Sequence, residues 1–190
     1  GAVVRLAPIK DVKTMIYAFF ELHERLPKVR LHIMGGVDDE EYGAECHALV
    51  ETLGVHDLIF TGRVNVVEYM EKLDFTILTS ISEGQPLSVL ESLAACRPCV
   101  TTEVGCCREL LEGAPGDDFG VAGFVTPPMY RKGLADAMER MCTSRARRIE
   151  MGERGQRRVA TYFLHEQMLA NYRALYDETA QAFDLPREGE

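Results

Sequence analysis

The chain has 190 residues, of which 46% are hydrophobic, and a formal net charge of -9 at pH 7. This composition allows one substantial globular core, and the negative charge argues against non-specific binding to nucleic acid or anionic membranes. No apolar run approaches the roughly 18 residues of a membrane-spanning helix. Because Lys10, Asp11 and Lys13 interrupt the first apolar residues, we expect no signal peptide and predict a cytoplasmic protein.

Short apolar runs alternate with helical periodicities along the chain, which is typical of a parallel sheet with crossover helices. Strands are predicted over residues 2–7, 29–34, 58–61, 73–79, 99–102 and 123–125. The intervening helices are predicted over residues 12–26, 42–53, 66–70, 86–96 and 108–111, and further helices over 130–142, from 144 onward and over 166–183. The sequence therefore predicts an α/β fold, with a Rossmann-like parallel sheet of about six strands, helices on both faces and extra C-terminal helices.

Glu83 and Glu91 lie eight positions apart and bracket the start of the helix that follows the fourth strand. Pro86 suits a first helical position, so the next amides, of Leu87 and Ser88, become unpaired donors at a positive helix end. Ionised carboxylates accept hydrogen bonds from adjacent sugar hydroxyls. The pattern therefore favours binding of a phosphorylated sugar compound at this helix end, although two unrelated surface glutamates would give the same spacing.

Other polar residues follow the remaining predicted strands, at the sheet edge where ligands bind in parallel α/β folds. Arg5 and Lys10 follow the first strand and could reach a diphosphate, whereas Gly35-Gly36-Val37-Asp38 after the second strand does not match a dinucleotide-binding loop. Gly62-Arg63-Val64 and Val104-Gly105 follow the third and fifth strands. We expect these loops to converge on one crevice.

Three further clusters have simpler explanations than a metal, redox or polyanion site. The Cys96 and Cys99 pair lies at a helix-to-strand junction without a second pair, so we predict buried, reduced thiols. Residues 38–41 are acidic and could bind Mg²⁺, but acidic residues also favour a helix start. The arginines between Arg145 and Arg158 alternate with glutamates, which favours a solvated helix with i,i+4 ion pairs over a polyanion-binding face.

Four segments together resemble the carboxyl-terminal domain of family 4 retaining glycosyltransferases of GT-B architecture. They are Arg5-Leu-Ala-Pro-Ile-Lys10, Ile59-Phe-Thr-Gly-Arg-Val64, Ser82-Glu-Gly-Gln-Pro-Leu-Ser-Val-Leu-Glu91 and Val104-Gly-Cys-Cys-Arg-Glu-Leu110. Within that family, residues 8–14, the Cys-Arg-Glu-Leu stretch and Ala122-Gly123 are similar to the Pel exopolysaccharide glycosyltransferases. The glycine turn at residues 35–38 departs from the usual family pattern.

The resemblance implies a donor site for a nucleotide diphosphate sugar, with UDP-glucose as the donor and without a metal or other cofactor. It implies catalytic roles for Arg5 and Lys10 on the diphosphate and for Glu83 at the transferred sugar, and ribose binding by Glu91. The remaining donor contacts implied are Arg63 and Val64 near the base, and Gly84, Gln85, Pro86, Leu87 and Ser88 along the sugar and phosphates.

The expected domain division is a donor-binding domain over residues 1–165 and a crossover helix and tail over residues 166–190. We expect the acceptor-binding N-terminal domain of the parent chain to be absent, so that these residues alone transfer little sugar. Expected partners are the donor, that missing domain and membrane components of polysaccharide synthesis, but no nucleic acid. Two alternatives stay open, a UDP-sugar 2-epimerase domain and a non-catalytic nucleotide-sugar-binding module.

Overall fold

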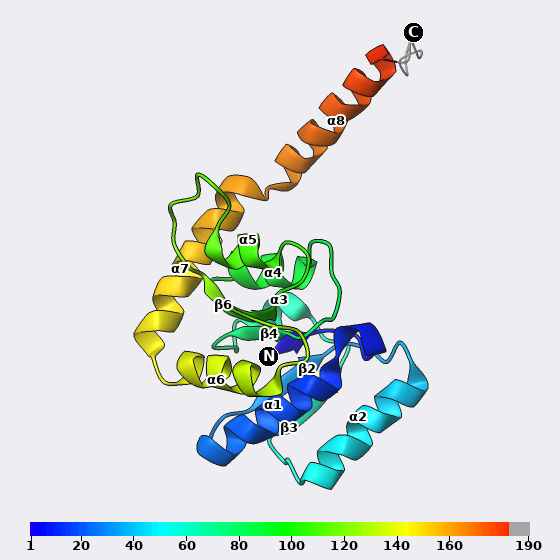
Figure 1. Ribbon diagram of the computed structural model, residues 1–190, viewed down its shortest axis with the longest axis vertical. Coiled ribbons are helices and arrows are strands. Elements are labelled where there is room, and N and C mark those ends of the chain that lie inside the picture. Colours follow the sequence, from blue (N-terminus) through cyan, green and yellow to red (C-terminus); the bar gives the residue numbers. More distant parts are fainter. Residues whose placement is uncertain (183–190) are drawn as a thin grey trace.

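The computed structural model describes residues 1–182 as a sheet covered by helices, from which the last helix projects (Figure 1). The strands are β1 (Ala2–Val3), β2 (Leu31–Met34), β3 (Leu58–Gly62), β4 (Thr76–Leu78), β5 (Cys99–Thr102) and β6 (Gly123–Thr126). The helices are η1 (Pro8–Lys10), α1 (Val12–Arg25), α2 (Glu40–Leu53), α3 (Val66–Met70), α4 (Leu87–Ala94), α5 (Cys107–Glu112), α6 (Arg131–Cys142), α7 (Arg145–Tyr162) and α8 (His165–Ala182). The predicted α/β class with six parallel strands is confirmed.

The strands form two three-stranded parallel sheets, in the orders β1-β2-β3 and β4-β5-β6. The two sheets meet at β1 and β4, where the amide of Ile77 donates to the carbonyl of Gly1 at 2.9 Å. The combined order is therefore 3-2-1-4-5-6, and the strand order reverses between β1 and β4. In a doubly wound sheet, ligands bind in the crevice at the carboxyl ends of the strands beside this reversal.

Helices cover both faces of the sheet and bury separate apolar clusters (Figure 1). On one face, α1 packs against α2 and α6, and most of its apolar positions, including Phe19 and Leu22, are fully buried. On the other face, α4 and α5 bury Leu93 and Leu110 against the β4–β6 half of the sheet. These helix positions recur at the 3.6-residue spacing of an amphipathic helix, from which the helices are predicted. The packing holds the strand ends, and thus the loops after them, in fixed relative positions.

Several predicted boundaries differ from the structure. The first strand is predicted to reach residue 7 but ends at Val3, and beyond it Leu6 makes an isolated bridge to Val37. Pro86 is the N-cap of α4 and not its first helical residue. The predicted end of the last helix at residue 183, like the rest of the tail to 190, lies outside the described residues.

The structure also describes the cysteines and the acidic residues 38–41, for which the sequence offered a metal or redox site as an alternative. Among the described residues all six cysteines are free, but only three are buried and the others, including Cys96, are half-buried. Burial raises the pKa of Cys99 to about 12, which keeps its thiol protonated. Asp39 caps α2 through a hydrogen bond from the Tyr42 amide at 2.9 Å, as expected for an acidic helix start.

The arginine-rich segment forms α7, but not every arginine in it is solvated as predicted. Arg154 pairs with Glu150 one turn away, which confirms the expected i,i+4 pattern. Arg158 is instead buried, with 1% of its surface exposed, and its Nε donates to Asp117 at 2.5 Å. It also donates to the carbonyls of Leu110 and Gly120. Burial is possible because the Asp117 carboxylate and these backbone carbonyls accept the hydrogen bonds of the guanidinium.

No helix within residues 1–182 has the length and apolarity needed to cross a membrane.

Candidate functional site

Two loops, one after β1 and one after β4, lie in direct contact where the strand order reverses. The Thr79 hydroxyl donates to the carbonyl of Lys10 at 2.9 Å. The amide of Ile81 donates to the carbonyl of Ile9, also at 2.9 Å. Thr79 itself is fully buried, so these bonds are shielded from water. Buried hydrogen bonds therefore join the two loops.

Lys10 and Glu83, one from each loop, form an ion pair in which Lys10 Nζ lies 2.6 Å from Glu83 Oε1. The Ser80 hydroxyl donates to the same carboxylate oxygen at 2.7 Å. The side chains of Lys10 and Glu83 are only 19% and 14% exposed, so solvent screens their interaction less than it would a surface pair. The structure thus brings together two residues that are 73 positions apart and that the sequence analysis assigned to one site.

A third loop, after β5, supports the segment that carries Glu83. Gly105 has φ +50, and a Cβ placed on it would lie 2.1 Å from the carbonyl oxygen of Gly84 and 2.4 Å from that of Glu83. The next amide, of Cys106, donates to the Gly84 carbonyl at 2.9 Å. Only glycine allows this approach, because any side chain would displace the segment. Gly105 therefore sets the position of the Glu83 backbone.

The N-terminus of α4 opens next to this segment. Pro86, the N-cap, is buried but has no side-chain group that could cap the helix. The amides of Leu87 and Ser88 have no acceptor among residues 1–182, while Val89 already donates to the Pro86 carbonyl at 3.1 Å. Free amides at a positive helix end favour an anion. The adjoining Gly84 and Gln85 are exposed, so this helix end is open to solvent.

Arg5 lies in the loop after β1 but pairs with a residue that the sequence analysis did not assign to the site. Its Nη1 lies 2.6 Å from Asp38 Oδ2, and both side chains are about half exposed. The amide of Asp38 donates to the Leu6 carbonyl at 3.1 Å, and the Leu6 amide donates to the Gly36 carbonyl at 2.9 Å. Backbone bonds thus hold the carboxylate beside Arg5.

The loop after β3 lies on the other side of this glycine turn. Arg63 is exposed and its guanidinium packs against Gly36, with Nε 3.2 Å from the position of a Cβ there. Val64 is half-buried. A residue larger than glycine at position 36 would therefore move Arg63. Arg5, Arg63 and Lys10 all occupy the same edge of the sheet, as predicted from their places after parallel strands.

Glu91 lies elsewhere on α4, one helical turn beyond the open amides. It is exposed, and no residue within 1–182 forms a hydrogen bond or ion pair with its side chain. It lines a cavity of about 620 Å³ whose walls come from α4, the end of α7 and α8, including Leu87, Tyr162, Met168 and Tyr172. The wall formed by α8 is a feature that the sequence analysis did not predict.

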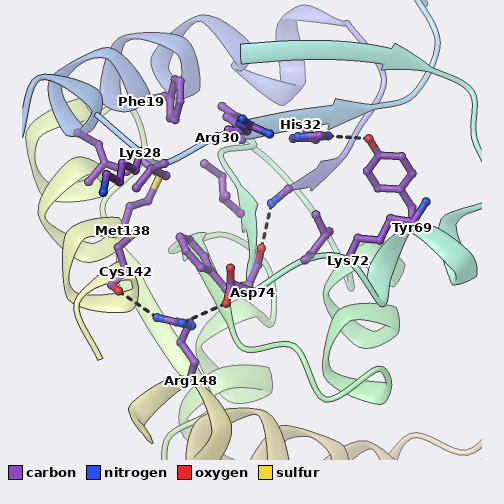
Figure 2. Close-up of a pocket in the computed structure, with 17 residues that line it drawn as sticks. Phe19, Lys28, Arg30, His32, Tyr69, Lys72, Asp74, Met138, Cys142 and Arg148 are labelled. Carbon is purple, nitrogen blue, oxygen red and sulfur yellow. Dashed lines mark hydrogen bonds and ion pairs between the residues drawn. The ribbon is translucent and has the colours of Figure 1, made fainter. Parts of the chain in front are cut away.

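A second cavity, of about 490 Å³, lies at the opposite edge of the sheet. Figure 2 shows its lining, which includes Lys28, His32 and Tyr69, with His32 Nδ1 2.6 Å from the Tyr69 hydroxyl. Arg148 reaches across it to Asp74 at 3.0 Å. Because this cavity lies at the amino ends of the strands, it is not where a doubly wound sheet binds its ligand. The loops around Lys10 and Glu83 remain the candidate site.

Two contributors to the site were missed from the sequence. Ser80 precedes Glu83 by three positions, the spacing of a local side-chain bond, but serines at such spacings are common in loops. Asp38 carried no local signal for pairing with Arg5, since 33 positions separate them.

The described residues contain no group of three or more His, Cys, Asp or Glu side chains that could hold a metal ion. The absence of a metal requirement stays a prediction.

Comparison with known proteins identifies the family. Residues 1–144 match the family described as glycosyl transferases group 1. The chain is 26% identical over 170 residues to N-acetyl-alpha-D-glucosaminyl L-malate synthase of Bacillus anthracis, covering 88% of this chain and 42% of that protein. It is 37% identical over 87 residues to the O-antigen biosynthesis glycosyltransferase WbnH of Escherichia coli, covering 46% of this chain and 24% of that protein. The chain thus spans less than half the length of these curated relatives.

Solved structures share the fold. HepE of Anabaena matches with a TM-score of 0.80 at 21% identity, over 92% of this chain and 48% of that one. The C-terminal domain of LpcC, a group 1 glycosyltransferase of Francisella tularensis, matches with a TM-score of 0.75 at 19% identity, over 86% of this chain and 85% of that one. At these identities the likeness concerns the fold alone. Together with the match over residues 1–144, it shows that the chain belongs to the group 1 glycosyltransferases, which are of GT-B type.

Proposed function

We propose that the chain is the donor-binding part of a retaining glycosyltransferase that transfers a hexose from a nucleotide diphosphate sugar to a growing polysaccharide or another acceptor. The observation that carries the proposal is the Lys10–Glu83 pair at the reversal of strand order, 2.6 Å apart and mostly buried beside the open amides of α4. A cation, a carboxylate and an anion-binding helix end match the three chemical parts of such a donor.

The diphosphate would be held by Lys10, Arg5 and the free amides of Leu87 and Ser88. When the bond between sugar and diphosphate breaks, negative charge develops on the leaving phosphate oxygen. Fixed cations and oriented amides stabilise that charge more than they stabilise the neutral ester linkage, which lowers the barrier. This chemistry requires no metal ion, and we propose that the chain binds its donor without one.

The sugar and the nucleoside would lie on either side of the diphosphate. Glu83, oriented by Ser80 and Lys10, would accept hydrogen bonds from hydroxyls of the transferred hexose. Glu91 would accept the ribose hydroxyls, and backbone around Arg63 and Val64 would contact the base. Gly84, Gln85 and Pro86 would line the path between them. The choice of UDP-glucose is supported by HepE, whose structure contains that nucleotide sugar.

The larger protein that we propose is a member of the Pel exopolysaccharide group, PelF. Residues 1–165 would be its donor-binding domain, and the helix and tail over residues 166–190, which the structure describes as far as residue 182, would cross to an acceptor-binding N-terminal domain. Its coverage of only 42% of the Bacillus anthracis relative supports such a division. We expect the acceptor site and any contact with membrane components of polysaccharide synthesis to lie in that larger cytoplasmic protein.

Calorimetric titration of the chain with UDP, UDP-glucose and ADP-glucose, with and without EDTA, tests the proposal. We expect uridine-selective binding that EDTA does not weaken, and a loss of roughly tenfold or more in Lys10→Gln, because a charge-assisted contact to phosphate is removed. Lys132→Gln, which removes an exposed lysine from α6, is the matched control. A folded chain that prefers ADP-glucose, or binds only with a divalent ion, would contradict the proposal.

Sugar transfer itself provides a second test. The isolated chain should bind donor without transferring glucose to an acceptor, whereas the full-length parent should do both and retain the anomeric configuration. Conversion of UDP-glucose into a C2 epimer, with no transfer, would favour the epimerase alternative. Nucleotide affinity that is unchanged in both Lys10→Gln and Glu91→Gln would favour a binding module that uses another surface.

A further inference from the structure

We propose that Asp38 competes with the donor diphosphate for Arg5 and thereby weakens the binding of free UDP more than that of UDP-glucose. The inference rests on the proposed function. Its structural basis is the 2.6 Å contact between Arg5 Nη1 and Asp38 Oδ2 at the edge of the sheet where the donor would lie. A carboxylate thus pairs with the cation that would otherwise receive a phosphate oxygen.

The backbone makes this competition a fixed property of the site. The amides of Asp38 and Asp39 both donate to the Leu6 carbonyl at 3.1 Å, and the Leu6 amide donates to the Gly36 carbonyl at 2.9 Å. Asp38 therefore stays beside the loop that carries Arg5, even if the ion pair opens. Because Arg5 and Asp38 are about half exposed, the pair itself is weak and a diphosphate can displace the carboxylate.

Lys10 differs from Arg5 in this respect. Its carboxylate partner, Glu83, has a role in the proposed site, since it would turn to the sugar hydroxyls when the donor binds. The proposed site assigns no substrate hydroxyl from which Asp38 would accept a hydrogen bond, so its negative charge remains near the diphosphate. The two ion pairs at this edge are therefore not equivalent, and only the Arg5–Asp38 pair opposes the ligand.

The opposing charge acts differently on donor and product. The diphosphate of UDP-glucose is esterified at both ends, whereas free UDP has a terminal phosphate that gains a further negative charge near pH 7, because its second pKa is about 6. Repulsion by Asp38 should therefore be greater for UDP. A site with this charge would release the spent nucleotide faster than a site with a neutral residue at the same position.

Calorimetric titration of Asp38→Asn tests the inference. We expect UDP to bind about fivefold tighter, the size expected when one unit-charge repulsion across about 4 Å is removed in a solvent-exposed site. The gain for UDP-glucose should be smaller, and the affinity for uridine, which has no phosphate, should not change. Glu51→Gln, which removes one charge from the exposed far end of α2, should leave all three affinities unchanged and thus controls for net charge.

The outcomes separate this inference from the proposed function. Unchanged or weaker UDP binding in Asp38→Asn, beside normal binding by the wild-type chain, would overturn the inference alone. So would an equal gain for uridine, since that would mean a change in the loop and not in its charge. If neither protein binds any of the nucleotides, the inference falls together with the proposed function.

Discussion

Replacing Gly105 with alanine should destabilise the protein and also weaken nucleotide binding, because this glycine lies against the segment that carries Glu83. Two costs add. A non-glycine residue at φ +50 pays roughly 1–2 kcal/mol for the left-handed conformation. In addition, the new Cβ would lie 2.1 Å from the Gly84 oxygen and must push it about 1 Å away, an overpacking cost of about 1–3 kcal/mol.

A matched control separates the two costs. Gly54 has φ +64 at the end of α2, and a Cβ there would meet no atom within 4 Å. Gly54→Ala should therefore lose only the conformational part, roughly 1–2 kcal/mol, and bind UDP normally. Gly105→Ala should lose about 2–5 kcal/mol, with UDP affinity reduced as Glu83 moves.

Urea unfolding followed by circular dichroism measures both variants, since the chain has no tryptophan. Calorimetry with UDP then tests the site. Equal destabilisation by the two substitutions, with equal UDP affinity, would refute the reasoning, because it would mean that the loop after β5 adapts without moving the donor segment. A loss of stability in Gly105→Ala without any loss of affinity would refute only the link to Glu83.

Three other predictions concern packing, pH and the ribose contact. The hydrogen bond from Arg158 lowers the pKa of the buried Asp117 carboxyl below its usual value of 3.8, so this pair should stabilise the fold above about pH 4 and lose that effect as pH falls. Asp117→Asn should lower the free energy of unfolding by about 3–5 kcal/mol at pH 7 and make that free energy depend less on pH in the acid range. The same pH dependence in the variant and the wild type would contradict this. Gly152→Ala would place a Cβ 2.2 Å from the Cys96 carbonyl and should lower the unfolding free energy by about 1–3 kcal/mol in urea, an effect whose absence would mean that α7 shifts freely. Glu91→Gln should weaken UDP binding several-fold with an unchanged melting temperature, because its side chain is exposed; unchanged affinity would remove Glu91 from the site.

Much of the fold could be predicted because its determinants are local. Apolar spacing predicted α1 and α2 within a few residues, Gly54 ends α2 in the left-handed conformation, and β5 begins and ends where its apolar run does. The errors arose where tertiary contacts override local preference. The polar residues around Arg158 predict that its side chain is solvated, yet the carboxylate of Asp117, 41 positions away, allows it to be buried.

The candidate site was predictable only in part, for a related reason. Lys10 and Glu83 could each be assigned to a strand end, but their contact depends on β1 lying next to β4, which is a property of strand order. Asp38 was missed because the pairing of Arg5 depends on how the glycine turn folds back over the loop after β1. The donor roles of these residues stay predictions until nucleotide binding is measured.

Helix α8 projects from the rest of the described chain (Figure 1), and among the α-helices within residues 1–182 it alone has no buried residue. Packing of a buried face provides most helical stability in proteins, and α8 has no such face along its 18 residues. We therefore expect α8 to open by local unfolding at far lower free energy than α1 or α4, and its amides to exchange hydrogen first. Since α8 forms one wall of the cavity beside Glu91, we expect that wall to unfold and refold while the sheet and the Lys10–Glu83 pair stay intact.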